Sequence, residues 1–181
     1  DHDENDFEMN KILLTDVLTY DNEWIWSGSF ELFFHNTDHL VRALRGGTIG
    51  LNCRFSHSLE PGSVYHTNFY QFSGNFTWFK ELFRRRVFSI QGMMYFTRTY
   101  NNGIISFYDL PCLGSEETMR GFERGRFRDR DMISLKTECC YPISEKTNAL
   151  ILCDCGRVFH NMFDEFSKND WNFSYGFGFR V

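Results

Sequence analysis

Large apolar residues alternate with small or polar residues over several segments of this chain. A two-residue period of this kind is typical of β-strands whose two faces meet different surroundings. It is clearest at 171–180, where aromatic and small or polar residues alternate: Trp171, Phe173, Tyr175, Phe177 and Phe179 against Asn172, Ser174, Gly176, Gly178 and Arg180. The segment therefore predicts a strand with one aromatic face.

Four other segments show the same alternation, at 24–34, 47–56, 132–142 and 148–159. Their apolar positions are Trp24, Trp26, Phe30, Leu32 and Phe34, then Ile49, Leu51, Cys53 and Phe55, then Ile133, Leu135, Cys139 and Tyr141, then Ala149, Ile151, Cys153 and Cys155. Segments 7–20, 63–79 and 85–100 are also strand-like, with noisier alternation. The sequence thus predicts about eight strands, many of them longer than a globular strand.

The predicted connections alternate in length. Segments 81–84 and 144–147 read as short turns, whereas 101–130 and 160–170 read as long loops. The segment 38–44 could form a short helical turn. Short turns on one side and long loops on the other are typical of outer-membrane barrels, whose strands need about ten residues to span the bilayer. We therefore expect one all-β domain over residues 1–181, an antiparallel transmembrane β-barrel with a long loop at 101–131.

A soluble, lipocalin-like ligand-binding barrel is the alternative from a different class. Such a barrel also has eight antiparallel strands, and its apolar face would point inward around a small ligand. The long predicted strands, the long loop at 101–131, and opposite faces rich in Gly, Ser and Asn argue against it. A soluble barrel would remain in solution without detergent, which separates the two interpretations.

Composition adds limits to this interpretation. Aromatic residues make up 18% of the chain, with 21 Phe, yet mean hydropathy is only −0.40, because apolar positions alternate with polar ones. No apolar run is long enough for a transmembrane helix. A net charge of −5 and a pI of about 5.7 do not suggest a nucleic-acid partner. The first residues, beginning at Asp1, contain no initiator Met, so we expect either a removed signal peptide or an internal fragment.

Six cysteines are spread along the chain, at Cys53, Cys112, Cys139, Cys140, Cys153 and Cys155. Their spacing does not match a zinc site, because Cys153 and Cys155 are separated by one residue and no paired His motif accompanies them. Packing inside strands is the favoured role, with a disulfide or a metal site left open.

The long loop carries most of the candidate chemistry. It contains five arginines, Arg120, Arg124, Arg126, Arg128 and Arg130. Glu138 and Asp154 follow on the polar faces of two consecutive predicted strands. If the apolar face meets lipid, both carboxylates point into the lumen, where the Arg120 guanidinium could bind them in a bidentate manner. Gly121 would permit the sharp turn of a loop folded back into a barrel.

No pattern of catalytic residues accompanies these charges. Ser115 has no His nearby in the sequence, and the histidines are scattered. We therefore expect no catalytic residues, no enzyme activity, no metal and no cofactor.

A series of motifs then occurs in order along the second half of the chain. It comprises Phe107-Tyr108-Asp109-Leu110-Pro111, Leu113-Gly114, Met119-Arg120-Gly121-Phe122, Arg126-Phe127-Arg128-Asp129, Glu138, Tyr141-Pro142, Leu152-Cys153-Asp154-Cys155-Gly156-Arg157-Val158 and Tyr175-Gly176-Phe177-Gly178-Phe179-Arg180. With this series the chain resembles the C-terminal barrel of the BamA/TamA-type outer-membrane assembly factors, the bacterial surface-antigen family. The resemblance is strong over 104–181 and weaker over 7–100.

The resemblance implies a role for the loop. Arg120, Gly121 and Phe122 match an Arg-Gly-Phe/Tyr motif at the tip of a lumen-plugging extracellular loop. Its acidic partner would be Asp154, which with Gly156 matches a Phe-x-Asp-x-Gly motif. Glu138, in turn, matches the family's Glu-Tyr strand. Two positions depart from the family, since Leu152 replaces the usual Phe and Cys139 replaces the preferred Tyr.

The resemblance also implies about sixteen strands preceded by periplasmic POTRA domains. We therefore expect an internal part of a larger barrel, because side chains would fill the interior of an eight-stranded one. The implied function is insertion or translocation of β-barrel client proteins at the bacterial outer membrane, without a cofactor. The implied partners are outer-membrane lipids, unfolded client proteins and periplasmic accessory proteins. A two-partner secretion translocator and the barrel anchor of a patatin-like lipase remain alternatives.

Overall fold

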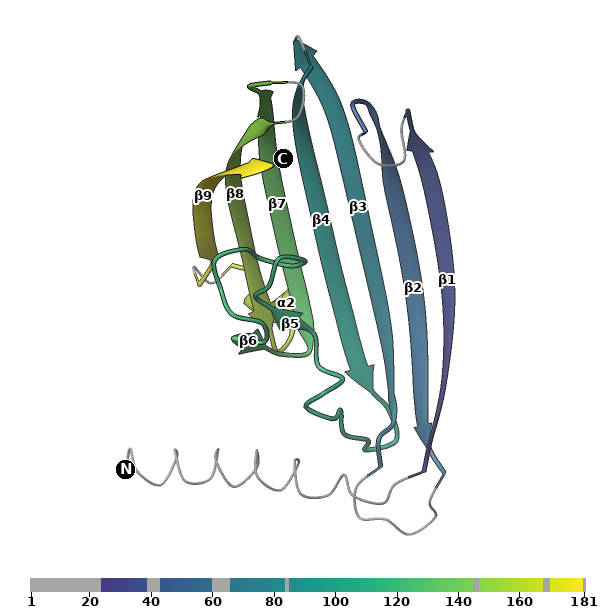
Figure 1. Cartoon of the computed structure of the whole chain (residues 1–181). Helices are drawn as coiled ribbons and strands as arrows, with labels where there is room; N and C mark the ends of the chain where they lie inside the picture. The colour runs from purple at the N-terminus through teal and green to yellow at the C-terminus, as the bar shows by residue number, and fades with distance from the viewer. Residues whose placement is uncertain are drawn as a thin grey trace, which may run out of the picture.

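The computed structural model describes residues 24–38, 43–59, 66–83, 85–144, 147–167 and 170–180. Seven long strands form one sheet in the order β1-β2-β3-β4-β7-β8-β9, and every neighbouring pair is antiparallel (Figure 1). The strands are β1 Ile25–Thr37, β2 Gly46–Ser58, β3 Phe69–Phe83, β4 Arg86–Thr99, β7 Asp131–Pro142, β8 Asn148–Phe159 and β9 Asn172–Arg180. The antiparallel, almost entirely β architecture confirms the predicted fold class, and the seven described strands form an open sheet, not a closed barrel.

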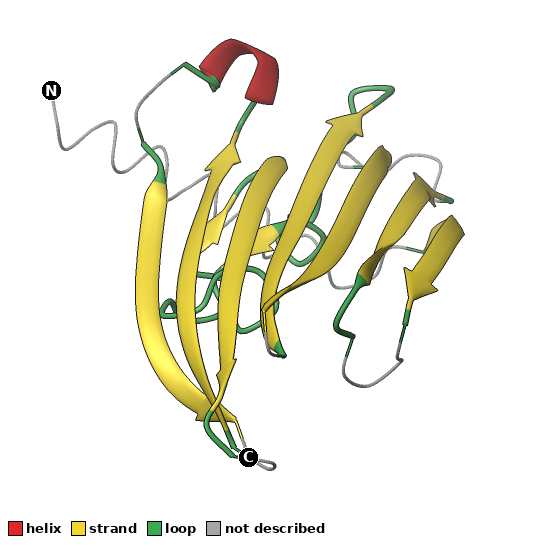
Figure 2. Cartoon of the chain, turned by 90° about the horizontal axis from the view of Figure 1, so that it is seen from above, coloured by secondary structure: helices red, strands yellow, loops and turns green. Residues whose placement is uncertain are grey.

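Three short elements lie in the two long connections. Strands β5 (Cys112–Leu113) and β6 (Phe127–Arg128) pair with each other inside the β4–β7 loop. A single turn of helix, α2 (Met162–Glu165), follows β8, and Asn161 caps it by accepting a hydrogen bond from the Phe163 amide. Figure 2 shows this helix at the end of the long strands, apart from the loop that carries β5 and β6.

Element boundaries differ from the sequence-based expectation mainly around the β3–β4 hairpin. The predicted strand at 63–79 is Phe69–Phe83, and β4 begins at Arg86. The connection is therefore tighter than the turn expected at 81–84, and Arg85 in it has a positive φ of 60°. The strand expected at 7–20 and most of the helical turn expected at 38–44 lie outside the described residues.

Each strand places its residues alternately on two faces, as the sequence pattern predicted. We call the outer face the one that carries Trp26, Leu51, Trp78, Met94, Tyr141, Ile151 and Phe177, one from each strand and all of them exposed. On β9 the outer residues Tyr175 and Phe177 are 92% and 86% exposed. An apolar surface that runs across all seven strands is far larger than the patches a soluble monomer normally exposes.

The opposite face, which we call the loop face, carries the β4–β7 loop (Figure 1). The buried core lies between this loop and the sheet. It consists of Leu113 and Met119 from the loop and Met132 from β7, with the partly buried Met93 and Tyr95 of β4 packed against them. The β4–β7 loop thus packs on the loop face, whereas large apolar side chains of the outer face are exposed over much of the sheet.

The described residues contain no helix of the length and apolar character needed to cross a membrane.

The two faces predict opposite responses to a new charge at neighbouring positions of β2. Leu51 points outward, is 51% exposed and lies in the middle of the strand, whereas Asn52 points to the loop face opposite Glu31. In the complete protein folded into phospholipid vesicles, Leu51→Arg should lower the free energy of unfolding by about 2–4 kcal/mol, because an arginine would enter the hydrocarbon.

Asn52→Arg is the matched control, and it should change that free energy by less than about 1 kcal/mol, since its charge faces Glu31 across the strand pair. Denaturant titration followed by tryptophan fluorescence measures both variants. Equal effects at the two positions would contradict the assignment of the outer face to lipid.

Candidate functional site

The candidate site begins with a tight turn in the β4–β7 loop. Ser115 and Met119 exchange backbone hydrogen bonds of 3.1 and 3.0 Å, so residues 115–119 close on themselves. Gly114, just before the turn, has a φ of +108°, and a Cβ there would lie 2.2 Å from the Glu123 carbonyl oxygen. Met119 is fully buried against the sheet, so the turn presents the next residue, Arg120, to β7 and β8.

Arg120 makes its main contact with Asp154 on β8. The guanidinium donates from Nε to Oδ2 at 2.8 Å and from Nη2 to Oδ1 at 2.6 Å, which is bidentate geometry. The Arg120 backbone N–H donates to the same carboxylate at 3.0 Å. Asp154 is only 1% exposed. A buried carboxylate needs such partners, because an unpaired charge in this position would be strongly destabilising.

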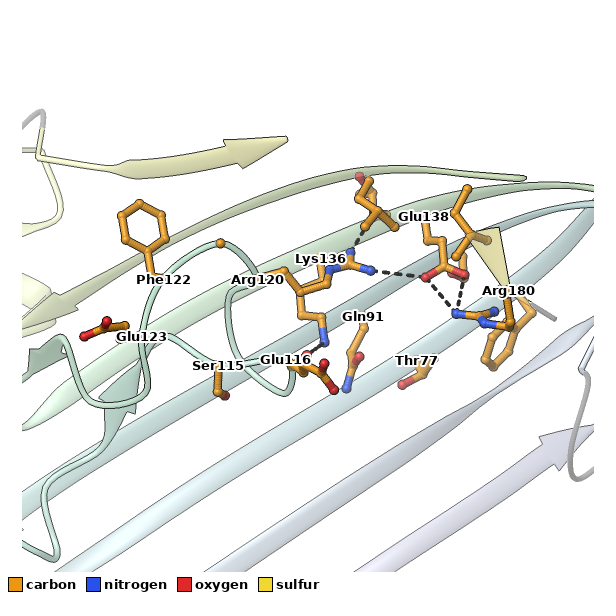
Figure 3. A pocket seen from close by; sticks show the side chains of 16 residues that line it. Thr77, Gln91, Ser115, Glu116, Arg120, Phe122, Glu123, Lys136, Glu138 and Arg180 are labelled. Carbon is orange, nitrogen blue, oxygen red and sulfur yellow. Dashed lines mark hydrogen bonds and ion pairs between the residues drawn. The ribbon is translucent and has the colours of Figure 1, made fainter. Parts of the chain in front are cut away.

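Glu138 on β7 is the second acceptor for Arg120. Its Oε2 accepts from Nη1 at 3.1 Å, and the neighbouring Thr137 carbonyl accepts from Nη2 at 3.1 Å. Glu138 also pairs with Arg180 of β9 at 3.0 Å. The Glu138 carboxylate therefore joins the loop to β9 (Figure 3). Asp154 joins the loop to β8.

The charge state of Arg120 follows from these contacts. The hydrogen bond to Asp154 and the negative charges of Asp154 and Glu138 raise the pKa of Arg120, while partial burial acts in the opposite direction. The guanidinium therefore stays charged over the physiological range.

Two further side chains of β7 donate hydrogen bonds to the backbone of the same turn. Lys136 donates from Nζ to the carbonyl oxygens of Glu116 and Glu117, the latter at 3.0 Å, and Ser134 donates to the Thr118 carbonyl. With Glu138 they form a row at every second position of β7, so one strand face contacts most of the turn. The sequence analysis did not identify Ser134 or Lys136, although their position on the polar face of β7 was recognised.

The other predicted residues occupy distinct places in this arrangement. Gly121 has a φ of +87°, and a Cβ at this position would come within 3.4 Å of Ser174 on β9. Phe122 packs edge-on against Phe127 at 5.5 Å between ring centroids and contributes to the core under the loop. Both residues follow Arg120 directly, so the loop contacts β9 and its own core immediately after the ion pairs.

Gly156 allows the loop to approach β8 closely. A Cβ at Gly156 would lie 2.8 Å from Cδ1 of Leu113, which is fully buried, and 3.0 Å from the Ile133 carbonyl oxygen. The absent side chain therefore leaves the space that Leu113 fills. Asp154 and Gly156 are two residues apart on one face of β8. This short stretch therefore provides both the carboxylate that binds Arg120 and the space that Leu113 occupies.

The loop is also fixed near its start, at a contact that the sequence analysis missed. Asp109 pairs with Arg54 of β2 at 2.8 Å, and its carbonyl accepts a hydrogen bond from Gln71 of β3 at 3.3 Å. Since Arg54 and Gln71 are on strands far from β8, the loop spans much of the loop face. A lone Arg54 at a polar strand position gave no indication of its partner.

A cavity of about 1000 Å³ lies between the turn and the sheet. Figure 3 shows Arg120, Lys136, Glu138 and Arg180 projecting toward it from one side, with Thr77 and Gln91 on the neighbouring strands. Its lining mixes cations, carboxylates and neutral polar groups. Such a lining suits a water-filled space.

The contacts around Arg120 are ion pairs and hydrogen bonds that hold the loop against β7 and β8. The residues around Arg120 include no serine or cysteine nucleophile paired with a histidine base. Among the described residues, no three His, Cys, Asp or Glu side chains are arranged to hold a metal ion. All six cysteines are free thiols, so the structure gives no disulfide. The arrangement can hold a loop against strands, and it can release the loop if the ion pairs open.

Comparison with known proteins places this geometry in context. The Omp85 superfamily domain matches the chain over residues 1–181. Among solved structures, BamA from Haemophilus ducreyi lacking POTRA domains 1–3 is similar, with a TM-score of 0.69 and 18% sequence identity over 84% of this chain. The chain covers 35% of that structure. No curated protein sequence matches the chain.

Neutralising Asp154 should release the turn from β8. In Asp154→Asn the amide cannot balance the Arg120 charge, and loss of one member of a buried pair costs on the order of 3 kcal/mol. We expect trypsin to cut the micelle-solubilised complete protein faster after Arg124, an exposed residue of the same loop. Asp170→Asn is the control, because Asp170 is 77% exposed and pairs with Arg157 at 3.6 Å. Equal cleavage of both variants would show that Asp154 does not hold the loop.

A side chain added at Gly156 should displace the loop by a steric route that leaves the charges intact. Gly156→Val would push against Leu113 and the β7 backbone, and we expect it to increase the same tryptic cleavage. Gly176→Val on β9 is the matched control, since a Cβ at Gly176 meets nothing within 4 Å. If Gly176→Val loosens the loop as much as Gly156→Val does, close approach of Leu113 is not what Gly156 provides.

Proposed function

Because the chain belongs to the Omp85 superfamily, we propose that it forms part of an outer-membrane barrel that inserts β-barrel client proteins, with Arg120 fastening a lumen loop. Membership of the Omp85 superfamily and the fold shared with a BamA barrel support a place in the outer membrane and a role in inserting or translocating proteins. The proposal adds two points, that the clients are β-barrel proteins and that Arg120 fastens the loop.

One observation carries the fastening role. Arg120, from a loop, is held by Asp154 and Glu138, which belong to two consecutive strands. The Arg120 backbone amide joins the same contact, so both the position of the loop and the direction of the side chain are fixed. In a closed barrel the loop face becomes the lumen side, because the outer face carries the apolar band that lipid requires. The loop would then lie inside the barrel.

The charges also connect the loop to the edge of the sheet. Glu138 contacts Arg120 and Arg180 at once, and Arg180 is at the end of β9. A change in the position of the loop therefore alters the ion pairing of β9. This connection supports a role in which the loop sets the conformation of the neighbouring strands during client insertion. Client folding would supply the free energy, so the proposal needs neither a nucleotide nor a cofactor.

The expected partners follow from the same surfaces. Lipids would contact the outer face, and unfolded β-barrel proteins would be the clients. Periplasmic accessory proteins would bind parts of the protein outside this chain.

Removing the Arg120 guanidinium tests the proposal. Arg120→Ala in the complete protein should lower severalfold the level of folded client barrels in the outer membrane, because the loop loses both of its carboxylate partners. Arg124→Ala is the matched control, since Arg124 lies in the same loop and is exposed. Heat-modifiable mobility on gels verifies that each variant is itself folded.

Normal client levels in a folded Arg120→Ala variant would contradict the fastening role. Normal client levels after complete depletion of the protein would contradict client insertion itself. That second result would favour the translocator of a dedicated exported partner.

A further inference from the structure

Two charged residues lie on the outer face of the sheet, at the end where β4 finishes and β7 begins. Asp131 occupies the same strand face as Ile133 and Leu135, and Arg98 occupies the face of Phe96. They form a bidentate pair, with Arg98 Nη1 donating to Oδ1 at 2.5 Å and Nη2 donating to Oδ2 at 2.9 Å. Asp131 is nevertheless 0% exposed.

The β8–β9 connection covers this pair. The Met162 amide of α2 donates to Asp131 Oδ2 at 2.9 Å, and Asn161 accepts from Arg98 Nη2 at 3.1 Å. Arg157, a charged residue on the outer face of the neighbouring strand β8, donates to the Glu165 carbonyl at 3.1 Å. This connection therefore folds onto the outer face, whereas the β4–β7 loop folds onto the opposite one.

Physical chemistry gives a reason for the cover. Charged groups that face hydrocarbon are costly unless they are paired and their hydrogen-bonding capacity is satisfied. The cover leaves the Arg157 side chain only 6% exposed and supplies acceptors and donors to Arg98 and Asp131. At this end of the sheet, the β8–β9 connection therefore lies between the charged residues of the outer face and lipid.

The cover itself presents aromatic rings outward. Phe166 stacks on the buried Phe159 at 6.3 Å, and Trp171 contacts both rings at about 6 Å. Phe163 lies 5.7 Å from Phe96, an outer-face residue of β4. Phe163 is nevertheless 77% exposed and Phe166 is 55% exposed. More than half of the surface of each residue is therefore open in the part of the chain that the structure describes.

These rings continue the apolar surface of the sheet. Trp171 is the first outward residue of the column that β9 extends through Phe173, Tyr175, Phe177 and Phe179. Next to the rings lie the polar groups Asn161, Asp164 and Glu165 of α2 and its cap. Aromatic rings beside polar groups at the end of a lipid-facing band are typical of the membrane–water interface.

We propose that α2 and its flanking residues rest on the outer leaflet around the barrel, with Phe163 and Phe166 inserted at the boundary between head groups and acyl chains. The occupant is the bilayer, because the patch is continuous with the lipid-facing aromatic column of β9. The connection has two roles at this position, to anchor this end of the barrel and to seal the Arg98–Asp131 pair from lipid. The proposal does not depend on client insertion.

Site-specific photocrosslinking tests the contact with lipid. Phe163 is replaced by p-benzoylphenylalanine in the complete protein, which is then folded into phosphatidylcholine–phosphatidylglycerol vesicles and irradiated. Mass spectrometry should detect phospholipid adducts at a yield comparable with that of the same probe at Phe177, an outer-face residue that is 86% exposed. A second probe at Phe166 repeats the test if the first variant does not fold.

The negative control is the probe at Tyr108, which is 71% exposed but lies next to Asp109, whose carboxylate is held on the loop face by Arg54. That position should give no phospholipid adduct. The proposal is overturned if probes at Phe163 and Phe166 give no phospholipid adduct in folded protein. It is also overturned if they crosslink only to protein, which would indicate a protein partner at this surface.

Discussion

The carboxylate of Asp154 imposes the strongest constraint on this structure, because it is almost completely buried and the arginine of its own strand, Arg157, lies on the opposite face. Its positive partner comes from Arg120, in a loop that precedes β7. Three donors from that one residue satisfy it, and one of them belongs to the backbone. The path of the loop, the tight turn at 115–119 and the gap left at Gly156 all serve to bring this residue to β8. Packing of Leu113 and Met119 then stabilises an arrangement whose position is set by charge.

A second buried carboxylate, Asp131, is paired with an arginine on the opposite face of the sheet. Arg98 and Asp131 form a bidentate pair there, and the α2 connection closes over it as the β4–β7 loop closes over Asp154. Both buried carboxylates accept backbone amides as well as guanidinium groups, so each ion pair also fixes a loop. The two loops start at the same end of the sheet, and as a result that end is covered on both faces (Figures 1 and 2). At the other end, β3 ends at Phe83 and β4 begins at Arg86, so that connection is short.

Strand parity made much of this predictable from the sequence. Alternation at 171–180 and 148–159 assigned Phe177 outward and Asp154 inward, and the register of β8 with β9 agrees with both assignments. Strand parity alone could not predict that the β8–β9 connection covers part of the outer face. Asp131 and Arg157 occupy outward positions where a lipid-facing strand should be apolar. Such exceptions are explained only by the connection that folds over them. Lys136 was also missed, since its partners are backbone carbonyls, which no residue pattern reveals. Strand parity also predicted the contact of Arg120 with two strands, because it put Glu138 and Asp154 on the same side of the sheet, and the family resemblance added the loop motif.

The position of Asp154 has a consequence for how the strands find their alignment. A slip of β8 by one residue would turn Asp154 to the outer face and bring Cys153 or Cys155 under Arg120. The guanidinium would then lose its bidentate partner, and a carboxylate would face lipid. Only one alignment of β8 places Asp154 under Arg120 and Gly156 under Leu113 at the same time. The contacts of the loop with Asp154 and Gly156 therefore stabilise one register of β8 over a register shifted by one residue.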